Sequence, residues 1–341
     1  MRQITQRGFS LVELMVAMAI GLLLLAGVAS LFFSSKVTYL TNEKTARLQE
    51  NGRIAVELMV HDIRSAGYVG CAKEAFFNTT LDVAGDPRWD YSQPVLGFES
   101  LGDGTFSPAL GVALDPVPVL DSDVVVVRMP VRDRPAMTLR TDLATSADDL
   151  TVLAASAQVN AGDIMMISDC QASSVFQVSA WVPGAPNGQI QHAVGGAGPG
   201  NLTADLGFQY LAGARILPLQ TIVYWVGDDG TGPALWRQVG DADAEMLVEG
   251  VQALQLAYGE DVDADRVANN YVSADLVTDW NDVISVSLSL LARSEEVGTD
   301  VDTATYNLLD PALGGLALGP FDDRRQRMVF TTTAAVRNRA L

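Results

Sequence analysis

The sequence predicts an α+β fold in which one long N-terminal helix packs on an antiparallel β-sheet head. Residues 9–33 form an almost uninterrupted apolar run, and residues 34–67 carry apolar side chains at helical spacing. Beyond them, short β-branched runs alternate with turn residues, which is typical of antiparallel sheets. The chain has 341 residues, 48% of them apolar, so a head of residues 68–341 is large enough to bury its own core.

The first segment, residues 9–33, is long enough to cross a lipid bilayer. As a helix its 25 residues span about 38 Å, against about 30 Å of hydrocarbon. Arg2 and Arg7 precede it, which places the N-terminus in the cytoplasm and the rest of the chain outside. Glu13 is the one charged residue in the run. A carboxylate in lipid costs on the order of 3 kcal/mol, so Glu13 is expected to have a partner or a purpose.

The sequence RGFSLVELMVA over residues 7–17 resembles the processing site of type IV prepilins. The resemblance implies a leader peptide of residues 1–8, cleavage by prepilin peptidase after Gly8, and methylation of the new N-terminus at Phe9. It also implies that the carboxylate of Glu13, the fifth mature residue, meets the free amine of a neighbouring subunit during assembly. In a low dielectric, an amine and a carboxylate pair favourably when each would otherwise be buried alone.

A secretory signal peptide is the alternative interpretation of this segment. Small residues before Ser30 would permit ordinary signal-peptidase cleavage after Ala29. Against it, the apolar run exceeds the roughly 7 to 15 residues of a signal-peptide core and contains a carboxylate. The two interpretations differ in the first mature residue, which is Phe9 or Ser30.

Residues 34–67 are predicted to continue the same helix as an amphipathic stem, with Gly67 as its stop. The alternative is a membrane helix followed by an independent surface helix, with a break at Gly52.

In the head, residues 123–128, 221–226 and 283–290 give the clearest strand signals. The last run alternates aliphatic residues with Ser285, Ser287 and Ser289, which predicts one face on a core and one in water. Segments 182–200 and 300–320 are rich in Gly, Pro, Asn and Asp and are predicted to be loops. Large loop insertions or a second sheet are expected, because the head exceeds a minimal pilin head.

The charge of the chain is unevenly distributed. The formal net charge is −19, yet residues 1–70 hold seven basic against five acidic side chains, which leaves 15 against 36 for residues 71–341. Nucleic-acid binding relies on a basic surface that releases counterions from phosphates. No nucleic-acid partner is therefore predicted for the acidic head.

The two cysteines, Cys71 and Cys170, both lie on the extracytoplasmic side of the predicted topology. An even count in an oxidising compartment favours a disulfide. Closing a loop of about 100 residues removes up to about 4.7 kcal/mol of unfolded-chain entropy in the simple model, and about 2 to 4 kcal/mol is usual. Two free buried thiols are the alternative.

Several segments beyond the stem resemble PilW-like minor pilins. They are residues 62–71, LVEGVQ at 247–252, YGED at 258–261, Asp279–Trp280 and residues 324–339, in the same order. The resemblance implies a type IV pilin-like fold and a minor pilin that helps initiate or prime pilus assembly, at or near the tip. Cell adhesion, twitching motility and DNA uptake are the activities it makes available.

The implied partners are other minor pilins, the major pilin, the prepilin peptidase and the inner-membrane assembly platform, with the lipid bilayer before assembly. The implied location is the bacterial inner membrane with the head in the periplasm, then the pilus at the cell surface. Two alternatives stay open: a minor pseudopilin of a type II secretion system, and a periplasmic ligand-binding or enzymatic domain on a pilin-like anchor.

Asp261, Asp263 and Asp265 are the candidate metal ligands, because alternate carboxylates can converge on calcium. Arg266 stands where an EF-hand has glycine and Val272 where it has glutamate, so a polar loop is preferred and calcium is the alternative. No cofactor is otherwise expected.

Catalysis is not predicted. The sequence has no G-x-S-x-G, H-E-x-x-H or C-x-x-C motif. The glycine-rich residues 195–200 have no flanking strand and helix to make a phosphate cradle. His61 and His192 are not paired with a nucleophile by any motif, so both are expected to be surface or structurally satisfied histidines.

Overall fold

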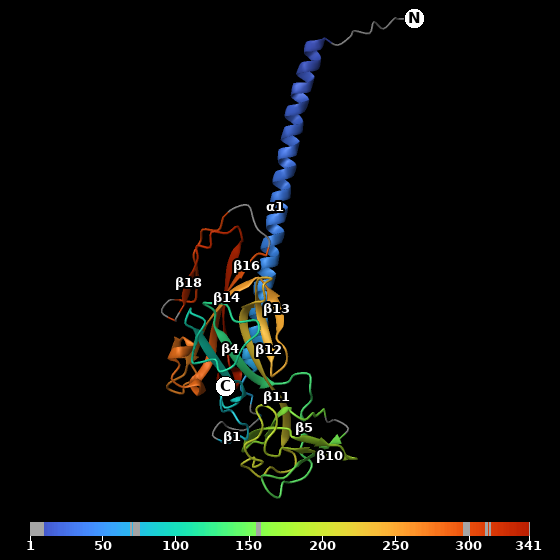
Figure 1. Ribbon diagram of the computed structural model, residues 1–341, viewed down its shortest axis with the longest axis vertical. Helices are drawn as coiled ribbons and strands as arrows, with labels where there is room; N and C mark the ends of the chain where they lie inside the picture. The colour runs from blue at the N-terminus through green and yellow to red at the C-terminus, as the bar shows by residue number, and fades with distance from the viewer. Residues whose placement is uncertain are drawn as a thin grey trace, which may run out of the picture. The chain divides into compact units, whose positions relative to one another are not determined.

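The computed structural model describes residues 10–68, 70, 76–154, 158–295, 301–310, 313 and 315–340 (Figure 1). The chain divides into two compact units, Met1–Arg47 and Leu48–Leu341. One helix, α1 (Leu11–Ser65), begins the described chain, and antiparallel sheets make up most of the rest. This confirms the predicted α+β pilin-like class. The helix is continuous through Gly52, so the alternative with a break there is wrong.

The second part of α1 buries one face, as its apolar spacing predicts. Leu48, Ala55, Met59 and Ile63 are buried in the main core together with residues from two sheets. The helix ends where the chain reaches Gly67, whose φ of +70° is a conformation that glycine adopts without strain. The Gly67 amide donates to the carbonyl of Arg128, so the chain leaves the helix directly onto the sheet.

The largest sheet has ten strands, and its main path runs β1-β8-β7-β11-β4-β2-β3. All its pairs are antiparallel except β1 with β8. The long strand β11 is central, since it pairs with β4, β5, β7 and β12. Its strands are β1 (Phe77–Thr79), β2 (Val95–Ser100), β3 (Phe106–Ser107), β4 (Val124–Pro130), β5 (Met137–Thr138), β7 (Ile164–Ser168), β8 (Ser173–Gln177), β11 (Arg215–Asp228), β12 (Pro233–Val239) and β13 (Glu245–Glu249).

A second sheet of four strands runs in the order β15-β14-β16-β19. Its strands are β14 (Val251–Glu260), β15 (Asn270–Val272), β16 (Val283–Arg293) and β19 (Arg327–Ala335). The three strand signals of the sequence thus fall in β4, β11 and β16. The aliphatic face of β16 enters the main core, as predicted.

The prediction that the serine face of β16 meets water is wrong. Ser285, Ser287 and Ser289 are all buried. The hydroxyl of Ser289 lies 2.9 Å from that of Thr331 on β19, and neighbouring strands flank the whole of β16. Near Leu291, the hairpin of β17 (Tyr306–Leu308) and β18 (Leu316–Leu318) adds further cover to the same sheet.

That hairpin lies inside residues 300–320, which were predicted to be a loop. A three-stranded sheet of β6 (Leu150–Leu153), β10 (Asn187–Gln191) and β9 (Ala180–Val182) likewise occupies part of the predicted loop 182–200. Both loop predictions are therefore wrong in part, because turn residues flank strands too short to show a period. The short helices are η2 (Pro87–Trp89), η4 (Ala274–Leu276), η5 (Trp280–Asp282) and α2 (Arg337–Ala340).

Candidate functional site

The N-terminal unit presents a long apolar surface. The large apolar side chains of α1 from Leu11 to Phe33 are exposed, and α1 is long and apolar enough to cross a membrane. Gly8 and Phe9, the predicted cleavage site, lie outside the described residues. Such a surface needs either lipid or other apolar helices around it.

Glu13 closes the first turn of α1. Its Oε2 accepts a hydrogen bond from the Ser10 amide at 3.0 Å and one from the Ser10 hydroxyl at 3.3 Å. In return the Glu13 amide donates to Ser10 Oγ at 3.2 Å. This reciprocal arrangement is a capping box, in which Ser10 is the N-cap and Glu13 the third helical residue.

The capping box places the carboxylate of Glu13 at the very start of the helix, against the amide of Ser10. Sequence reasoning missed this second role, although the signal was present as Ser10-x-x-Glu13. Cleavage after Gly8 would put the new amine one residue before Ser10. The same carboxylate can therefore serve the helix end and face an amine near it.

A buried polar contact holds the far end of α1 to the large sheet. Asp62 is buried, and its Oδ2 accepts a 2.6 Å hydrogen bond from the hydroxyl of Tyr224 on β11. Its Oδ1 forms a 2.8 Å ion pair with Arg132. Burial, and then the charge of Asp62, raise the pKa of the Tyr224 hydroxyl. The carboxylate thus has two partners in the interior, although a charged residue on an amphipathic stem is expected on its exposed face.

A second cluster of acids, of which Asp123 is buried, lies where β2 and β4 of the large sheet meet β14. Asp123 is buried and accepts hydrogen bonds from the amides of Ser100 at 3.1 Å and Leu256 at 2.8 Å. Burial, and then the charge of Asp275, raise the pKa of nearby Glu99 to about 7. One oxygen of Glu99 and the hydroxyl of Tyr258 are buried and have no hydrogen-bond partner in the described part of the chain. These groups make this part of the core sensitive to protonation.

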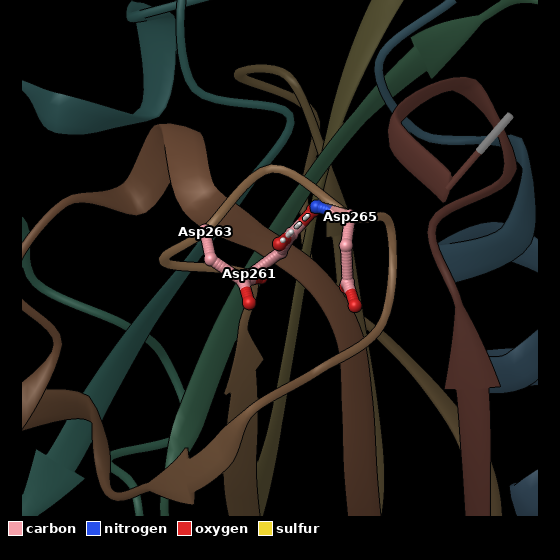
Figure 2. Close-up of side chains that lie close together, drawn as sticks. All are labelled: Asp261, Asp263 and Asp265. Atoms are coloured by element: carbon pink, nitrogen blue, oxygen red, sulfur yellow. Dashed lines mark hydrogen bonds between the residues drawn. The ribbon is translucent and has the colours of Figure 1, made fainter.

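Asp261, Asp263 and Asp265 do come together, in the loop between β14 and β15 (Figure 2). One carboxylate oxygen from each lies within 4.8 Å of the others. The two oxygens of Asp261 accept hydrogen bonds from the amides of Asp265 at 3.1 Å and Arg266 at 2.8 Å, so Asp261 shapes the loop itself. The three carboxylates suit a hard cation, and calcium at this loop stays a prediction.

The structure describes only one of the two cysteines of the predicted disulfide. Cys170 lies in the turn between β7 and β8, and no described cysteine is free. Cys71 lies outside the described residues. The Cys71–Cys170 pairing stays a prediction.

The histidines lie in different parts of the second unit. His61 is exposed on α1 and lies 3.7 Å from Asp62. His192 is buried after β10, packs on the ring of Phe176 with centroids 5.3 Å apart, and hydrogen-bonds the Asp148 carbonyl at 3.0 Å. His61 is thus a surface residue, and His192 is a packed core residue with one hydrogen bond.

Two family models match this sequence. The model described as type IV pilus-assembly protein W matches residues 223–338, which run from β11 through β19 into α2. The model of the prokaryotic N-terminal methylation motif matches residues 5–29, across Gly8, Phe9 and Glu13. Searches of curated proteins and of solved structures gave no match. Residues 223–338 are thus similar to the type IV pilus-assembly protein W family, PilW, and residues 5–29 carry the N-terminal methylation motif.

Proposed function

We propose that this chain is a minor pilin, made as an inner-membrane precursor, that helps initiate assembly of a type IV pilus at or near its tip. Prepilin peptidase cleaves after Gly8, and Phe9 is methylated. The apolar surface of α1 from Leu11 to Phe33 then leaves lipid for a bundle of similar helices, which exchanges one apolar surrounding for another at little cost.

The observation that carries the proposal is the carboxylate of Glu13 at the start of an otherwise apolar helix. It is exposed in the isolated chain and bonded only to Ser10 among the described residues. Among apolar helices an unpaired carboxylate is costly, so the bundle favours a register in which a neighbour supplies a charged amine. The amine of Phe9 on an adjoining subunit is that partner.

Further support comes from the two family matches. The methylation-motif match covers the proposed cleavage site, and the pilus-assembly match covers one sheet and part of another. The partners that follow are other minor pilins, the major pilin, the peptidase and the assembly platform of the inner membrane.

The first test is the N-terminus of the chain purified from cells, read by mass spectrometry. The expected product begins at methylated Phe9. An intact leader, or a start at Ser30, would refute the proposal.

The second test separates the two roles of Glu13. Glu13→Gln keeps an oxygen to accept from the Ser10 amide but removes the charge, whereas Ser10→Ala removes the cap and keeps the charge. In sheared filaments we expect Glu13→Gln to lower the amount of this protein by at least about tenfold, or about 1.4 kcal/mol. Ser10→Ala should leave it near the wild-type level.

Glu43→Ala is the matched control, because Glu43 lies on the same helix and forms a surface ion pair with Arg47 at 2.8 Å. Equal incorporation of Glu13→Gln and wild type would show that incorporation does not require the Glu13 carboxylate to pair with an amine. Recovery of the processed chain only from a secretion apparatus, and not from pili, would favour the pseudopilin alternative.

A further inference from the structure

The second unit contains a pocket lined by two arginines within an otherwise acidic domain. It measures about 240 Å³ and lies where β12 begins, the β13–β14 turn passes and β16 ends. Arg293 and Arg325 line it, together with Gly232 and Gly250, and Glu249 and Glu295 contribute carboxylates. Both glutamates are exposed, while Arg293 is half-buried.

The backbone around this pocket is closely packed and holds Arg293 in place. The Arg293 amide donates to the Gly250 carbonyl at 2.7 Å, and the Gly250 amide donates to the Pro233 carbonyl at 3.0 Å. Gly250 has φ +78°, and a Cβ there would lie 2.6 Å from the Arg293 carbonyl oxygen. A Cβ on Gly232 would lie 3.1 Å from Arg293 Nη2, so the guanidinium lies directly against this glycine.

Arg293 differs from its arginine neighbours in that no described residue forms a hydrogen bond or an ion pair with its guanidinium. Arg325 donates to the carbonyls of Ser294 and Glu295, and Arg327 is paired with Asp302 and Asp323. Among the described residues no hydrogen bond or ion pair is found for the Arg293 guanidinium, although two glutamates line the same pocket. Burial, and then the charges of Arg325 and Arg327, lower the pKa of Arg293, and the smaller effects of Asp323 and Asp228 act in the opposite direction. The N–H groups of this half-buried guanidinium are therefore available to an acceptor that enters the pocket.

We propose that this pocket binds a single carboxylate group, held by the guanidinium of Arg293 with Arg325 beside it. The planar fork of a guanidinium matches the two oxygens of a carboxylate, and each N–H can donate to a charged acceptor. The two glutamates already offset the two arginines in formal charge. A monoanion therefore fits this pocket better than a phosphate dianion, which would leave a larger negative excess.

The carboxylate has two possible sources, a free small acid and an acidic side chain of an adjoining subunit. The second source rests on the proposed function, since it requires a filament. It is supported by the position of the pocket beside α1, because Asn51 donates to the Glu249 carbonyl at 3.2 Å and so ties the β13–β14 turn to the helix.

The test uses the full chain in detergent micelles and follows thermal unfolding in sodium acetate, with sodium chloride at matched ionic strength as reference. Wild type should show a saturable stabilisation by acetate, and inorganic phosphate should bind more weakly. Arg293→Gln should weaken acetate binding by at least about tenfold. Arg140→Gln is the control, since Arg140 is exposed elsewhere on the second unit and should not change it.

A double variant, Glu249→Gln with Glu295→Gln, keeps both arginines. It therefore tests the pocket even if Arg293→Gln does not fold. It should bind acetate several-fold more tightly than wild type, because two competing carboxylates are gone. An equal acetate response in wild type and Arg293→Gln, no gain in the double variant, or tighter binding of phosphate than of acetate would each overturn the proposal.

The two sources are distinguished in cells. If Arg293→Gln is cleaved normally yet is depleted from sheared filaments, the ligand is a subunit side chain. If it is incorporated normally while acetate binding is lost in micelles, the ligand is a free acid. Failure of the proposed function would appear separately, as an uncleaved leader or as no effect of Glu13→Gln.

Discussion

The hydroxyl of Tyr224 donates a 2.6 Å hydrogen bond to Asp62 Oδ2, and this contact joins α1 to the central strand β11. Arg132 completes the arrangement from the other side of the carboxylate, at 2.8 Å. A buried carboxylate with two partners favours the rotation of the helix that brings Asp62 to them, since a buried charge without partners is costly.

We expect Tyr224→Phe to lower the free energy of unfolding by about 1 to 2 kcal/mol, because one bond to a charged acceptor is lost. Asp62→Ala should cost about 3 kcal/mol or more, because the Tyr224 hydroxyl and Arg132 both lose their partner. Chemical denaturation of the full chain in detergent measures both.

Glu57→Ala on the same helix is the control, since Glu57 is exposed and pairs with Arg53 at 3.0 Å, a contact worth at most about 0.5 kcal/mol. Asp62→Ala and Glu57→Ala with equal stability would show that the junction does not depend on the buried carboxylate.

The sequence could predict the parts of this fold that depend on neighbours in the chain. The α1 stem follows from apolar spacing, and β16 from a period of two. Asp62 could not be assigned to the interior, because its partner Tyr224 lies 162 residues away. Arg128 is similar: it ends a predicted strand, yet it is buried and its Nε donates to the Arg88 carbonyl at 2.9 Å.

The candidate site also has some features that depend on nearby residues in the chain and others that depend on distant ones. Glu13 was identified from its position in a local motif, and its cap on Ser10 was readable from the same four residues. The unpartnered guanidinium of Arg293 could not be predicted from the sequence, because Gly232, Gly250 and Arg325 come from three separate turns and strand ends. Pockets formed by distant segments leave no periodic signal in one sequence.

Gly52 gives a second prediction about the contact between α1 and the sheets. A Cβ at this position would lie 2.1 Å from the ring of Phe330 on β19, so only glycine lets the helix approach that closely. Gly52→Ala gains about 1 kcal/mol of helix propensity but overpacks the contact at about 1 to 3 kcal/mol. We expect a net loss of up to about 2 kcal/mol, and a larger loss for Gly52→Val.

Phe330→Ala is the second half of this experiment. In the Phe330→Ala background, Gly52→Ala should no longer destabilise the protein, because the ring that it displaces is gone. Equal effects of Gly52→Ala with and without the ring would exclude steric overlap as the cause.

The predicted disulfide can be checked directly. Peptide mapping without reductant should recover Cys71 and Cys170 in one linked fragment, and reduction should lower the free energy of unfolding by about 2 to 4 kcal/mol. The double variant Cys71→Ser with Cys170→Ser should unfold like the reduced wild type and no longer respond to reductant. Two unlinked thiols in the protein purified from the periplasmic side would refute the pairing.

Glu99 makes the stability of the second unit depend on pH. Burial, and then Asp275, raise its pKa from 4.5 to about 7 in the folded chain. Between these values the folded state holds a proton that the unfolded state has released. Stability from this group is therefore complete below pH 4.5, falls as pH rises, and is lost above about pH 7.

We expect Glu99→Gln to flatten the decline in stability between pH 4.5 and 7 and to unfold at higher temperature than wild type at pH 8. The gain at pH 8 should be on the order of 1 kcal/mol, because partial exposure of Glu99 screens part of the effect. Burial, and then the charge of Glu99, also raise the pKa of Asp123 well above its usual range, although the amides of Ser100 and Leu256 donate to it. The exposed Glu50→Gln should keep the wild-type profile. If Glu99→Gln follows the wild-type pH profile, Glu99 is already ionised in the folded protein, and a bound water or cation must compensate its buried oxygen.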